Sequence, residues 1–112
     1  MFKTSFVDSP RQAIFQLEGS LSLEVAATLR KSFWEVINSQ HIEYLVIDFS
    51  RVPQIDPATV SLLVATKNVV ARISATLVLV GLKPSHFAFL EKLNLHRYFD
   101  THPTLDAFLG TQ

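Results

Sequence analysis

The sequence predicts an α/β fold built around a mixed sheet, and three features carry this prediction. Two short, continuous apolar runs, 44–49 and 76–80, have the pattern of strands that helices cover on both faces. The segment between the runs has apolar residues at the helical period, and a strand, a helix and a strand in this order require a parallel, right-handed crossover. Two further strand-like stretches precede this unit. Together these features predict a mixed four- to five-stranded sheet with a parallel βαβ core, packed against about four helices.

The first two elements are expected to form a hairpin. Short apolar and aromatic stretches run from Phe2 to Val7 and from Ala13 to Leu17, and the turn-forming Asp8-Ser9-Pro10 separates them. A link this tight joins neighbouring antiparallel strands, so the hairpin is the expected start of the sheet.

A helix is predicted after the hairpin. Ser20 or Ser22 is available as its N-cap, and the helical period runs to about Ser39. Trp34 lies one position beyond the inward stripe, so it is either a partly exposed aromatic of the kind found at interfaces or a residue that closes the edge of the core. The inward stripe is Val25, Leu29, Phe33 and either Val36 or Ile37.

The crossover helix has the best-defined start in the sequence. Asp56 is a good N-cap, and Pro57 is favoured at the first helical position. The strand before it, Tyr44 to Phe49, is placed at the centre of the sheet, and the strand after it, Thr76 to Val80, is closed by Gly81. The residues that follow Pro57 at the helical period are Val60, Leu63, Val64, Lys67, Val70 and Ala71.

The C-terminal third of the chain adds smaller elements. Pro84 opens a third helix, whose inward residues are expected to be Phe87, Leu90 and Leu93. A short extended piece at Tyr98-Phe99 and an amphipathic turn over about Thr104 to Leu109 follow. No linker, repeat or low-complexity segment interrupts the chain, so residues 1–112 are expected to form a single domain.

Composition excludes several classes of function. The 112 residues are 48% apolar and 18% charged, which is far from the composition of a disordered chain. Ten basic residues are scattered among ten acidic ones, which argues against nucleic-acid binding. The lack of cysteine excludes disulfides, thiolate zinc sites and cysteine nucleophiles. With no signal-peptide pattern and no apolar run near the roughly 18 residues of a membrane span, a soluble cytoplasmic protein without direct membrane insertion is expected.

No catalytic or metal-binding constellation stands out. None of the histidines, at positions 41, 86, 96 and 102, forms the i, i+4 pair with a carboxylate that is typical of a zinc helix, so they are interpreted as surface or helix-end residues. Asp48 and Asp56 flank one loop, but Asp56 is expected to cap a helix. The three glycines stand apart and form no phosphate-binding loop. The sequence therefore predicts a protein that is not an enzyme and holds no metal or cofactor.

The sequence around the central strand resembles a STAS domain, the module of anti-sigma-factor antagonists and of the cytoplasmic tails of sulfate transporters. The resemblance lies in the strand Tyr44 to Phe49, in the following Ser50-Arg51-Val52-Pro53-Gln54-Ile55-Asp56, and in the helix after it. It continues through 76–84, which is similar to the family's next strand and its Pro-led turn, and through Leu93-Asn94-Leu95 with Tyr98-Phe99. No gap is needed from about residue 43 to residue 108, and the earlier residues match only in the order of elements.

The loop before the crossover helix departs from the family's pattern. In phosphorylatable members it reads Asp-Ser-Ser-Gly and a partner kinase modifies the second serine, whereas here it reads Asp56-Pro57-Ala58-Thr59. Ala58 has no hydroxyl, so the surface lacks the charge of roughly −2 that a phosphate would bring to the helix N-terminus. Thr59 is either a displaced phosphoacceptor or a residue whose hydroxyl supports the cap. We favour the second interpretation, because Thr early in a helix is structurally ordinary.

The resemblance implies a non-enzymatic interaction domain of signal transduction and transcription regulation, which works by partner switching. Its expected partner is an anti-sigma-factor kinase-like protein, which binds the loop and the crossover helix. Leu62 is rotated away from the inward stripe by roughly 100° per residue, so we expect it to be exposed there. The alternative is that this helix, which is apolar overall, is buried on more than one side and that Leu62 belongs to the core. The expected partner-binding residues are Arg51, Asp56, Pro57, Ala58, Thr59, Leu62 and Lys67.

Two alternatives within the resemblance stay open. One is an accessory cytoplasmic subunit of a lipid or anion transporter, bound to its ATPase or permease, which the loss of the phosphoacceptor suits. The other is a nucleotide- or small-ligand-binding sensor, for which the sequence offers no phosphate loop. The sequence also leaves open which partner is bound and whether the chain forms a homodimer.

Overall fold

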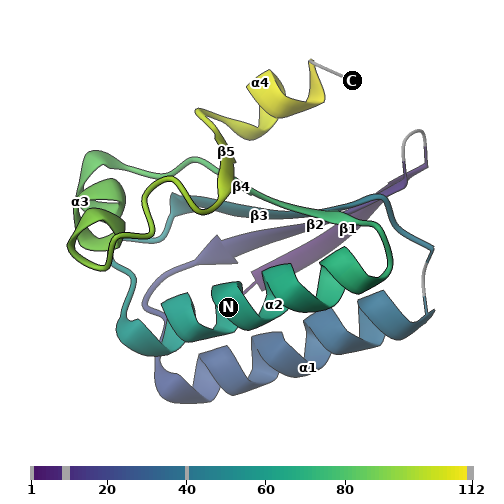
Figure 1. Ribbon diagram of the computed structural model, residues 1–112, viewed down its shortest axis with the longest axis horizontal. Coiled ribbons are helices and arrows are strands. Elements are labelled where there is room, and N and C mark those ends of the chain that lie inside the picture. The colour runs from purple at the N-terminus through teal and green to yellow at the C-terminus, as the bar shows by residue number, and fades with distance from the viewer. Residues whose placement is uncertain (1, 9–10, 40, 111–112) are drawn as a thin grey trace.

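Helices cover both faces of one sheet. The computed structural model describes residues 2–8, 11–39 and 41–110. In Figure 1, α1 and α2 lie together beneath the sheet, α4 lies above it, and α3 lies at one end. The elements in chain order are β1 (Phe2–Asp8), β2 (Arg11–Glu18), α1 (Leu23–Ser39), β3 (Tyr44–Arg51), α2 (Pro57–Arg72), β4 (Thr76–Val80), α3 (Pro84–Lys92), β5 (Asp100–His102) and α4 (Leu105–Leu109).

Over the described residues, the sheet has five strands in the order β1-β2-β3-β4-β5, and only the β1–β2 pair is antiparallel. The predicted mixed sheet is therefore confirmed. The predicted hairpin is confirmed as well, although residues 9 and 10 of its turn lie outside the described residues. Strand β3 is central, and its Leu45 and Ile47 lie opposite Leu77 and Leu79 of β4. All four side chains are buried, as the central parallel placement predicts.

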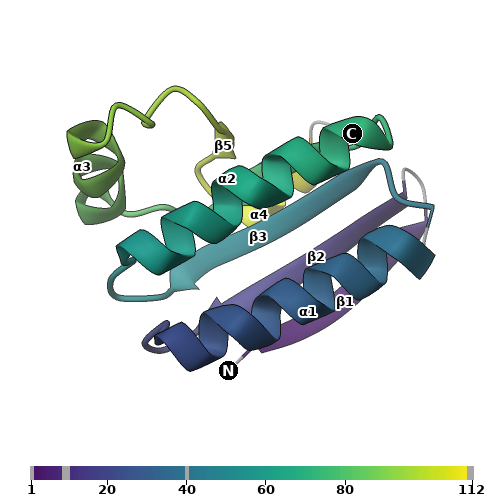
Figure 2. The same cartoon turned by 60° about the horizontal axis from the view of Figure 1, so that its bottom comes forward.

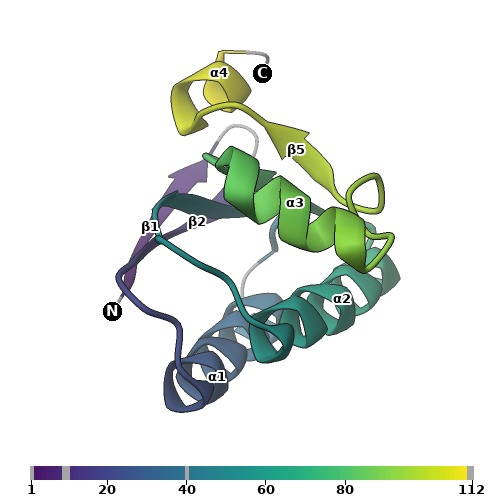
Figure 3. The ribbon, with the colours of Figure 1, turned by 90° about the vertical axis from the view of Figure 1, so that its left-hand side faces the viewer.

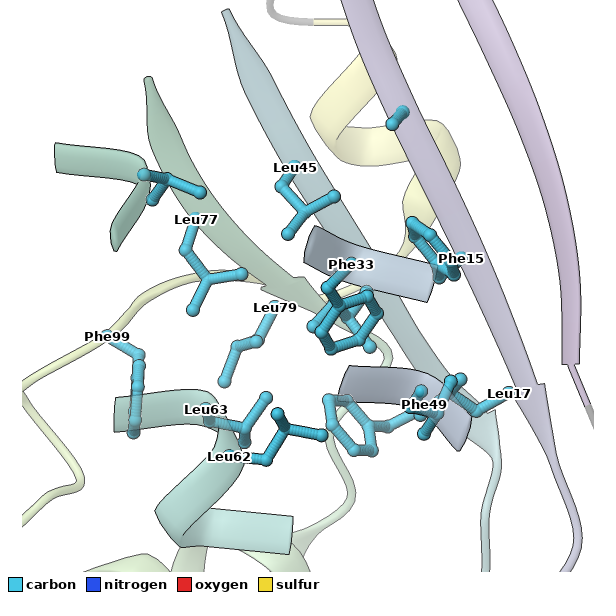
Figure 4. Close-up of a cluster of buried hydrophobic side chains, with 14 of the residues drawn as sticks. Phe15, Leu17, Phe33, Leu45, Phe49, Leu62, Leu63, Leu77, Leu79 and Phe99 are labelled. Atoms are coloured by element: carbon cyan, nitrogen blue, oxygen red, sulfur yellow. The ribbon is translucent and has the colours of Figure 1, made fainter. Parts of the chain in front are cut away.

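Both faces of β3 are covered, which explains its continuous apolar run. Leu45, Ile47 and Phe49 point to one face and belong to the main core under α1 and α2 (Figure 4). Val46 points to the other face and packs in a smaller cluster with Phe108 of α4. Strands of this kind lose the polar alternation of a half-exposed strand, because each side chain meets a helix.

Three helices begin at a capping side chain, and the sequence predicts two of these caps, those of α1 and α2. Of the two candidate serines, Ser22 caps α1, because its Oγ accepts a hydrogen bond from the Val25 N–H at 3.2 Å. Asp56 caps α2, with Pro57 in the first turn. The Thr104 hydroxyl accepts from the Ala107 N–H at 3.0 Å at the start of α4. Each side-chain oxygen satisfies a backbone donor that the helix itself leaves unpaired.

The inward face of α1 is wider than predicted. Val36 and Ile37 are both buried, Ala26 joins them, and Val25 is only partly buried. Trp34 packs against the edge of the core and is partly exposed, so both interpretations of it describe part of its surroundings. The Arg30 guanidinium lies 5.4 Å from the centre of its ring.

Two predictions for the C-terminal third are wrong. Helix α3 turns His86 and Leu90 inward, whereas Phe87 and Leu93 are 37% and 44% exposed. A helix of nine residues packs along one narrow stripe, and this stripe begins at His86, one position before the expected one. The short strand is β5 and not Tyr98-Phe99, which lies in a turn with Phe99 buried in the main core.

The buried face of α2 also differs from the prediction. Val64 and Lys67 are partly buried and Ala71 is exposed, whereas Thr59, Leu62 and Thr66 are buried. The reason is that α2 packs against the sheet on one side and against α1 on the other (Figure 2), so more than one stripe of the helix is covered. Among the helices of the described residues, none is long and apolar enough to span a bilayer.

Candidate functional site

The loop between β3 and α2 lies where the parallel strands β2 and β3 end. The same end of the sheet carries α3 and the N-termini of α1 and α2 (Figures 1 and 3). Val52 and Ile55 are buried and anchor the loop, and the Val52 N–H donates to the Phe49 carbonyl at 3.0 Å. Pro53 and Gln54 between them are exposed. The loop is thus fixed to the core by Val52 and Ile55 and exposes Pro53 and Gln54 to solvent.

The N-terminus of α2 is tightly capped and uncharged beyond its cap. The Asp56 Oδ1 accepts from the Thr59 N–H at 2.8 Å, and the Asp56 carbonyl accepts from the Val60 N–H at 3.1 Å. Pro57 is exposed and has no N–H, and Ala58 is partly buried. Asp56 and Pro57 therefore occupy or remove most of the donors that would hold an anion here.

The Thr59 side chain faces the interior. It is 2% exposed, and its Oγ1 is buried with no hydrogen bond to the described residues. The interpretation that this hydroxyl supports the cap is therefore wrong, since the cap uses the backbone N–H of Thr59.

The expected exposure of Leu62 is wrong. Leu62 is 7% exposed and belongs to the main core, and Figure 4 shows it beside Leu63. Leu63 is buried as the helical period predicts, but α1 covers the neighbouring stripe of α2 as well. The periodicity of α2 gives no information about this contact with α1. In the folded chain Leu62 supports the site from inside.

An apolar groove adjoins the N-terminus of α2. It has a volume of about 360 Å³ and runs between α1 and α2, which lie side by side in Figure 2. Small side chains on both helices leave this space open, and Leu23, 75% exposed, lies at its rim. Its lining residues are Leu23, Ala26, Ala27 and Arg30 of α1 and Ala58, Ser61, Leu62 and Ala65 of α2.

The sequence interpretation missed this groove, although the small residues gave a signal. Ala58, Ser61 and Ala65 recur at helical spacing on α2, and Ala26-Ala27 stands at a corresponding place on α1. Small residues at such spacing mark the part of a helix where a neighbour approaches closely or where a groove forms.

Two predicted partner-binding residues lie away from this place. Arg51 is exposed and lines a separate hollow of about 430 Å³ with Lys3, Gln16 and Asp48. Lys67 is partly buried, and its Nζ lies 5.0 Å from the centre of the Tyr98 ring. Ten residues of helix separate Lys67 from Pro57, which is a rise of about 15 Å. The structure thus brings Asp56, Pro57 and Ala58 together with the groove but leaves Arg51 and Lys67 outside.

A buried histidine connects the loop to α3. The His86 Nδ1 accepts from the Lys83 N–H at 3.0 Å, and the Lys83 Nζ donates to the Val52 carbonyl at 3.3 Å. The His86 ring also meets the Phe49 ring with 6.1 Å between centres. Burial lowers the pKa of His86 from its usual 6.5, and the Lys83 charge acts in the same direction, while the Val52 and Pro53 carbonyls oppose the shift. A neutral imidazole is what this arrangement requires, because Nδ1 must accept.

The other aspartates and histidines that the sequence offered as candidates for chemistry make hydrogen bonds or packing contacts within the fold, or lie exposed on the surface. The Asp48 Oδ1 accepts from the Ser50 N–H at 2.9 Å, as the Asp56 Oδ1 does from Thr59. Over the described ranges, no three His, Asp or Glu side chains gather as a metal site would require. His41 is exposed, and His102 packs its ring against Phe108.

Comparison with known families identifies the fold. A family model for the STAS domain matches residues 4–108, and the chain belongs to this family. The search among curated proteins gave no match.

Three of the solved structures with a similar fold show how low the sequence identity is. RsbS of Moorella thermoacetica, solved as a serine-to-glutamate variant, is 20% identical, covers 98% of this chain and 92% of its own, and has a TM-score of 0.84. SpoIIAA, a Bacillus cell fate determinant solved in its phosphorylated form, is 14% identical, covers 100% of both chains and has a TM-score of 0.77. A sulfate transporter family protein from Wolinella succinogenes is 19% identical, covers 88% of this chain and 81% of its own, and has a TM-score of 0.75.

Proposed function

We propose that this protein is a non-enzymatic interaction module of the cytoplasm, formed by one domain over residues 1–112, which binds a partner protein at the N-terminus of α2. The observation that carries the proposal is the continuity of an exposed, neutral helix start with an apolar groove. Pro57 is exposed, Ala58 borders the groove, and Leu23 stands at its rim. Exposed apolar surface of this kind beside a rigid loop is typical of protein-binding sites.

The proposed surface differs from the one expected from the sequence. It keeps Pro57 and Ala58 as contacts and Asp56 as the cap that fixes their position. Leu62 and Thr59 are buried and support the surface without contacting the partner. The groove residues Leu23 and Ser61 are the partner contacts instead. Arg51 and Lys67 lie outside the surface.

The site binds without a phosphorylation switch. The structural neighbour SpoIIAA exists in unphosphorylated and phosphorylated forms. Here Ala58 has no acceptor oxygen, and the Thr59 hydroxyl is buried. Regulation of binding at this site would therefore depend on the supply or state of the partner and not on modification of this loop.

The test introduces the missing negative charge. Ala58→Glu places a carboxylate in the first turn of α2, where the helix dipole favours it, so the variant is expected to fold with unchanged or slightly higher stability. Capture of the partner from extracts of the native host by the immobilised protein is expected to weaken at least roughly tenfold, or about 1.4 kcal/mol. Ala88→Glu, on the exposed face of α3, is the matched control and should leave capture unchanged. Equal capture by wild-type protein and Ala58→Glu would reject the site.

A transporter-associated role is the second candidate. It is supported by the sulfate transporter family protein among the structural neighbours and by the lack of a phosphoacceptor in the loop. Mass spectrometry of the captured protein separates the two. A kinase-like protein supports sigma-factor regulation, whereas a permease or a transport ATPase supports the transporter role.

A further inference from the structure

Two adjoining hollows lie at the carboxyl ends of the parallel strands β2, β3 and β4. Their volumes are about 430 and about 450 Å³, within the range of small-molecule sites. Gln16 of β2 and Asp48 and Ser50 of β3 line both hollows. The carboxyl ends of parallel strands are where open α/β sheets bind their ligands, so the side chains at this junction are candidates for ligand contacts.

Asp48 lies at the junction with its carboxylate held in one position. It is 7% exposed and shares a face of the sheet with Val46, which packs toward α4. Its Oδ1 accepts from the Ser50 N–H at 2.9 Å. Gly81 leaves room for this oxygen, because a Cβ there would lie 2.7 Å from it. A carboxylate fixed in this way on the central strand is preorganised.

The second oxygen of Asp48 lacks a protein partner. Over the described residues, Oδ2 accepts no hydrogen bond and Asp48 forms no ion pair. The atom is not enclosed, so it opens toward the hollows that Asp48 lines. A carboxylate withdrawn from water is costly unless a donor satisfies it, and a cationic donor does so most strongly. A ligand with an ammonium group supplies this donor.

The first hollow also carries two positive groups. Lys3 and Arg51 line it, and within the part of the chain that the structure describes neither is paired with a carboxylate. Lys3 lies opposite Gln16, which lies opposite Asp48, so the amine and the carboxylate start from the same face two strands apart. The other carboxylate of this hollow, Glu18, already makes an interaction of its own. Cations on one side and Asp48 on the other suit a ligand that bears both charges.

We propose that this hollow binds a free α-amino acid as its zwitterion. The ammonium group donates to the Asp48 Oδ2, and the carboxylate accepts from the Arg51 guanidinium and the Lys3 amine. A simple anion would be repelled by Asp48, and a simple cation by Lys3 and Arg51. Phe2 and Leu17 line the same hollow, so an apolar ligand side chain can pack there.

This site is separate from the proposed partner site. Asp48 faces the side of the sheet that carries α4, whereas the groove lies between α1 and α2 on the opposite side (Figure 1). The amino-acid site does not rest on the proposed function. Loss of ligand binding and loss of partner capture are therefore independent results.

Calorimetric titration of the protein with each proteinogenic L-α-amino acid tests the proposal. At least one is expected to bind with a Kd of about 1 mM or below, and those with apolar side chains should bind most tightly. The N-acetyl and the amide forms of the tightest ligand each lack one charge. Both are expected to bind at least roughly tenfold more weakly, and this comparison needs no variant.

Variants assign the two charges of the ligand to residues. Asp48→Asn keeps an oxygen that can accept from the Ser50 N–H but removes the negative charge, so it is expected to weaken binding at least roughly tenfold. Arg51→Gln should weaken binding as well. Arg97→Gln replaces an exposed arginine outside the hollow and is the matched control, which should leave binding unchanged.

Amide chemical shifts of the wild-type protein locate the ligand. Shifts of the Ser50 and Gly81 amides are expected to change during the titration, while those of Ala58 and Ser61 in the groove stay constant. The proposal is overturned if no amino acid binds below about 10 mM. Equal binding of the N-acetyl form, unchanged binding by Asp48→Asn, or shift changes confined to other parts of the fold would also reject it.

Discussion

His86 is the residue that joins α3 to the corner beside the loop of the candidate site. Its ring fills the space beside Phe49, and its Nδ1 caps α3 through the Lys83 N–H. Through the Lys83 amine, the same corner holds the Val52 carbonyl at the base of the loop. Protonation of Nδ1 would remove the acceptor and add a charge near Lys83. The stability of this corner therefore depends on a neutral histidine.

This arrangement predicts a pH dependence of stability. The folded-state pKa of His86 lies below 6.5, so between that pKa and 6.5 the unfolded chain binds more protons than the folded one. The free energy of unfolding is thus fully retained above pH 6.5 and falls as the pH drops through 6.5 toward the folded-state pKa. Urea denaturation at about pH 7.5 and about pH 5.5 measures the difference.

Two variants isolate the contribution of His86. In His86→Gln the side chain keeps an acceptor suited to a capping box and does not titrate, so the loss of stability between the two pH values is expected to be smaller than in the wild type. His41→Gln changes an exposed histidine and should keep the full wild-type loss. If His86→Gln and His41→Gln show the same pH dependence, the source lies elsewhere.

At the scale of single elements, the parallel core could be predicted because its signals are local. The start of α2 follows from Asp56 and Pro57, which act on the next turn of the same helix. The strands β3 and β4 follow from apolar runs too short for helices, and the crossover rule then fixes their direction. In each case the deciding residues lie within or next to the element itself.

The elements that were predicted wrongly depend on neighbours far along the chain. Leu62 is buried because α1 covers a second side of α2, and the α1–α2 groove at the candidate site exists for the same reason. Strand β5 is set by pairing with β4, whose Val78 lies opposite Asp100, and not by the aromatic residues just before it. Contacts of this kind are absent from local periodicity, so the sequence showed the loop of the site but not its groove.

The central position of β3 predicts a large cost for truncating its side chains. Ile47→Ala removes a fully buried side chain between β2 and β4 and should lower the free energy of unfolding by about 2–5 kcal/mol. Leu23→Ala, at an exposed position, should change it by less than about 0.5 kcal/mol. Urea denaturation of both variants measures this contrast, and a loss below about 1 kcal/mol for Ile47→Ala would contradict the packing described here.

At the scale of the whole molecule, the sheet separates two cores of unequal size. The larger one lies between the sheet and the helices α1 and α2, and it includes residues from β2, β3 and β4. The smaller one lies under α4, where Phe108 packs against Tyr44 at 5.4 Å and against His102 at 5.0 Å. The candidate site belongs to the side of the larger core. Its loop and groove therefore rest on the most extensively packed part of the fold.

The unequal cores predict that the β5–α4 segment opens before the rest of the protein. Strand β5 has three residues and, in the part of the chain that the structure describes, pairs with β4 alone, and α4 has five residues, so few contacts oppose local opening. Native-state hydrogen exchange should give lower opening free energies for amides of β5 and α4 than for those of β3, which is paired on both sides. Phe108→Ala should lower the values for α4 and β5 further, because it removes the main apolar anchor of α4, whereas Phe87→Ala on the exposed face of α3 should not. Equal opening free energies for α4 and β3 would show instead that the two cores unfold as one unit.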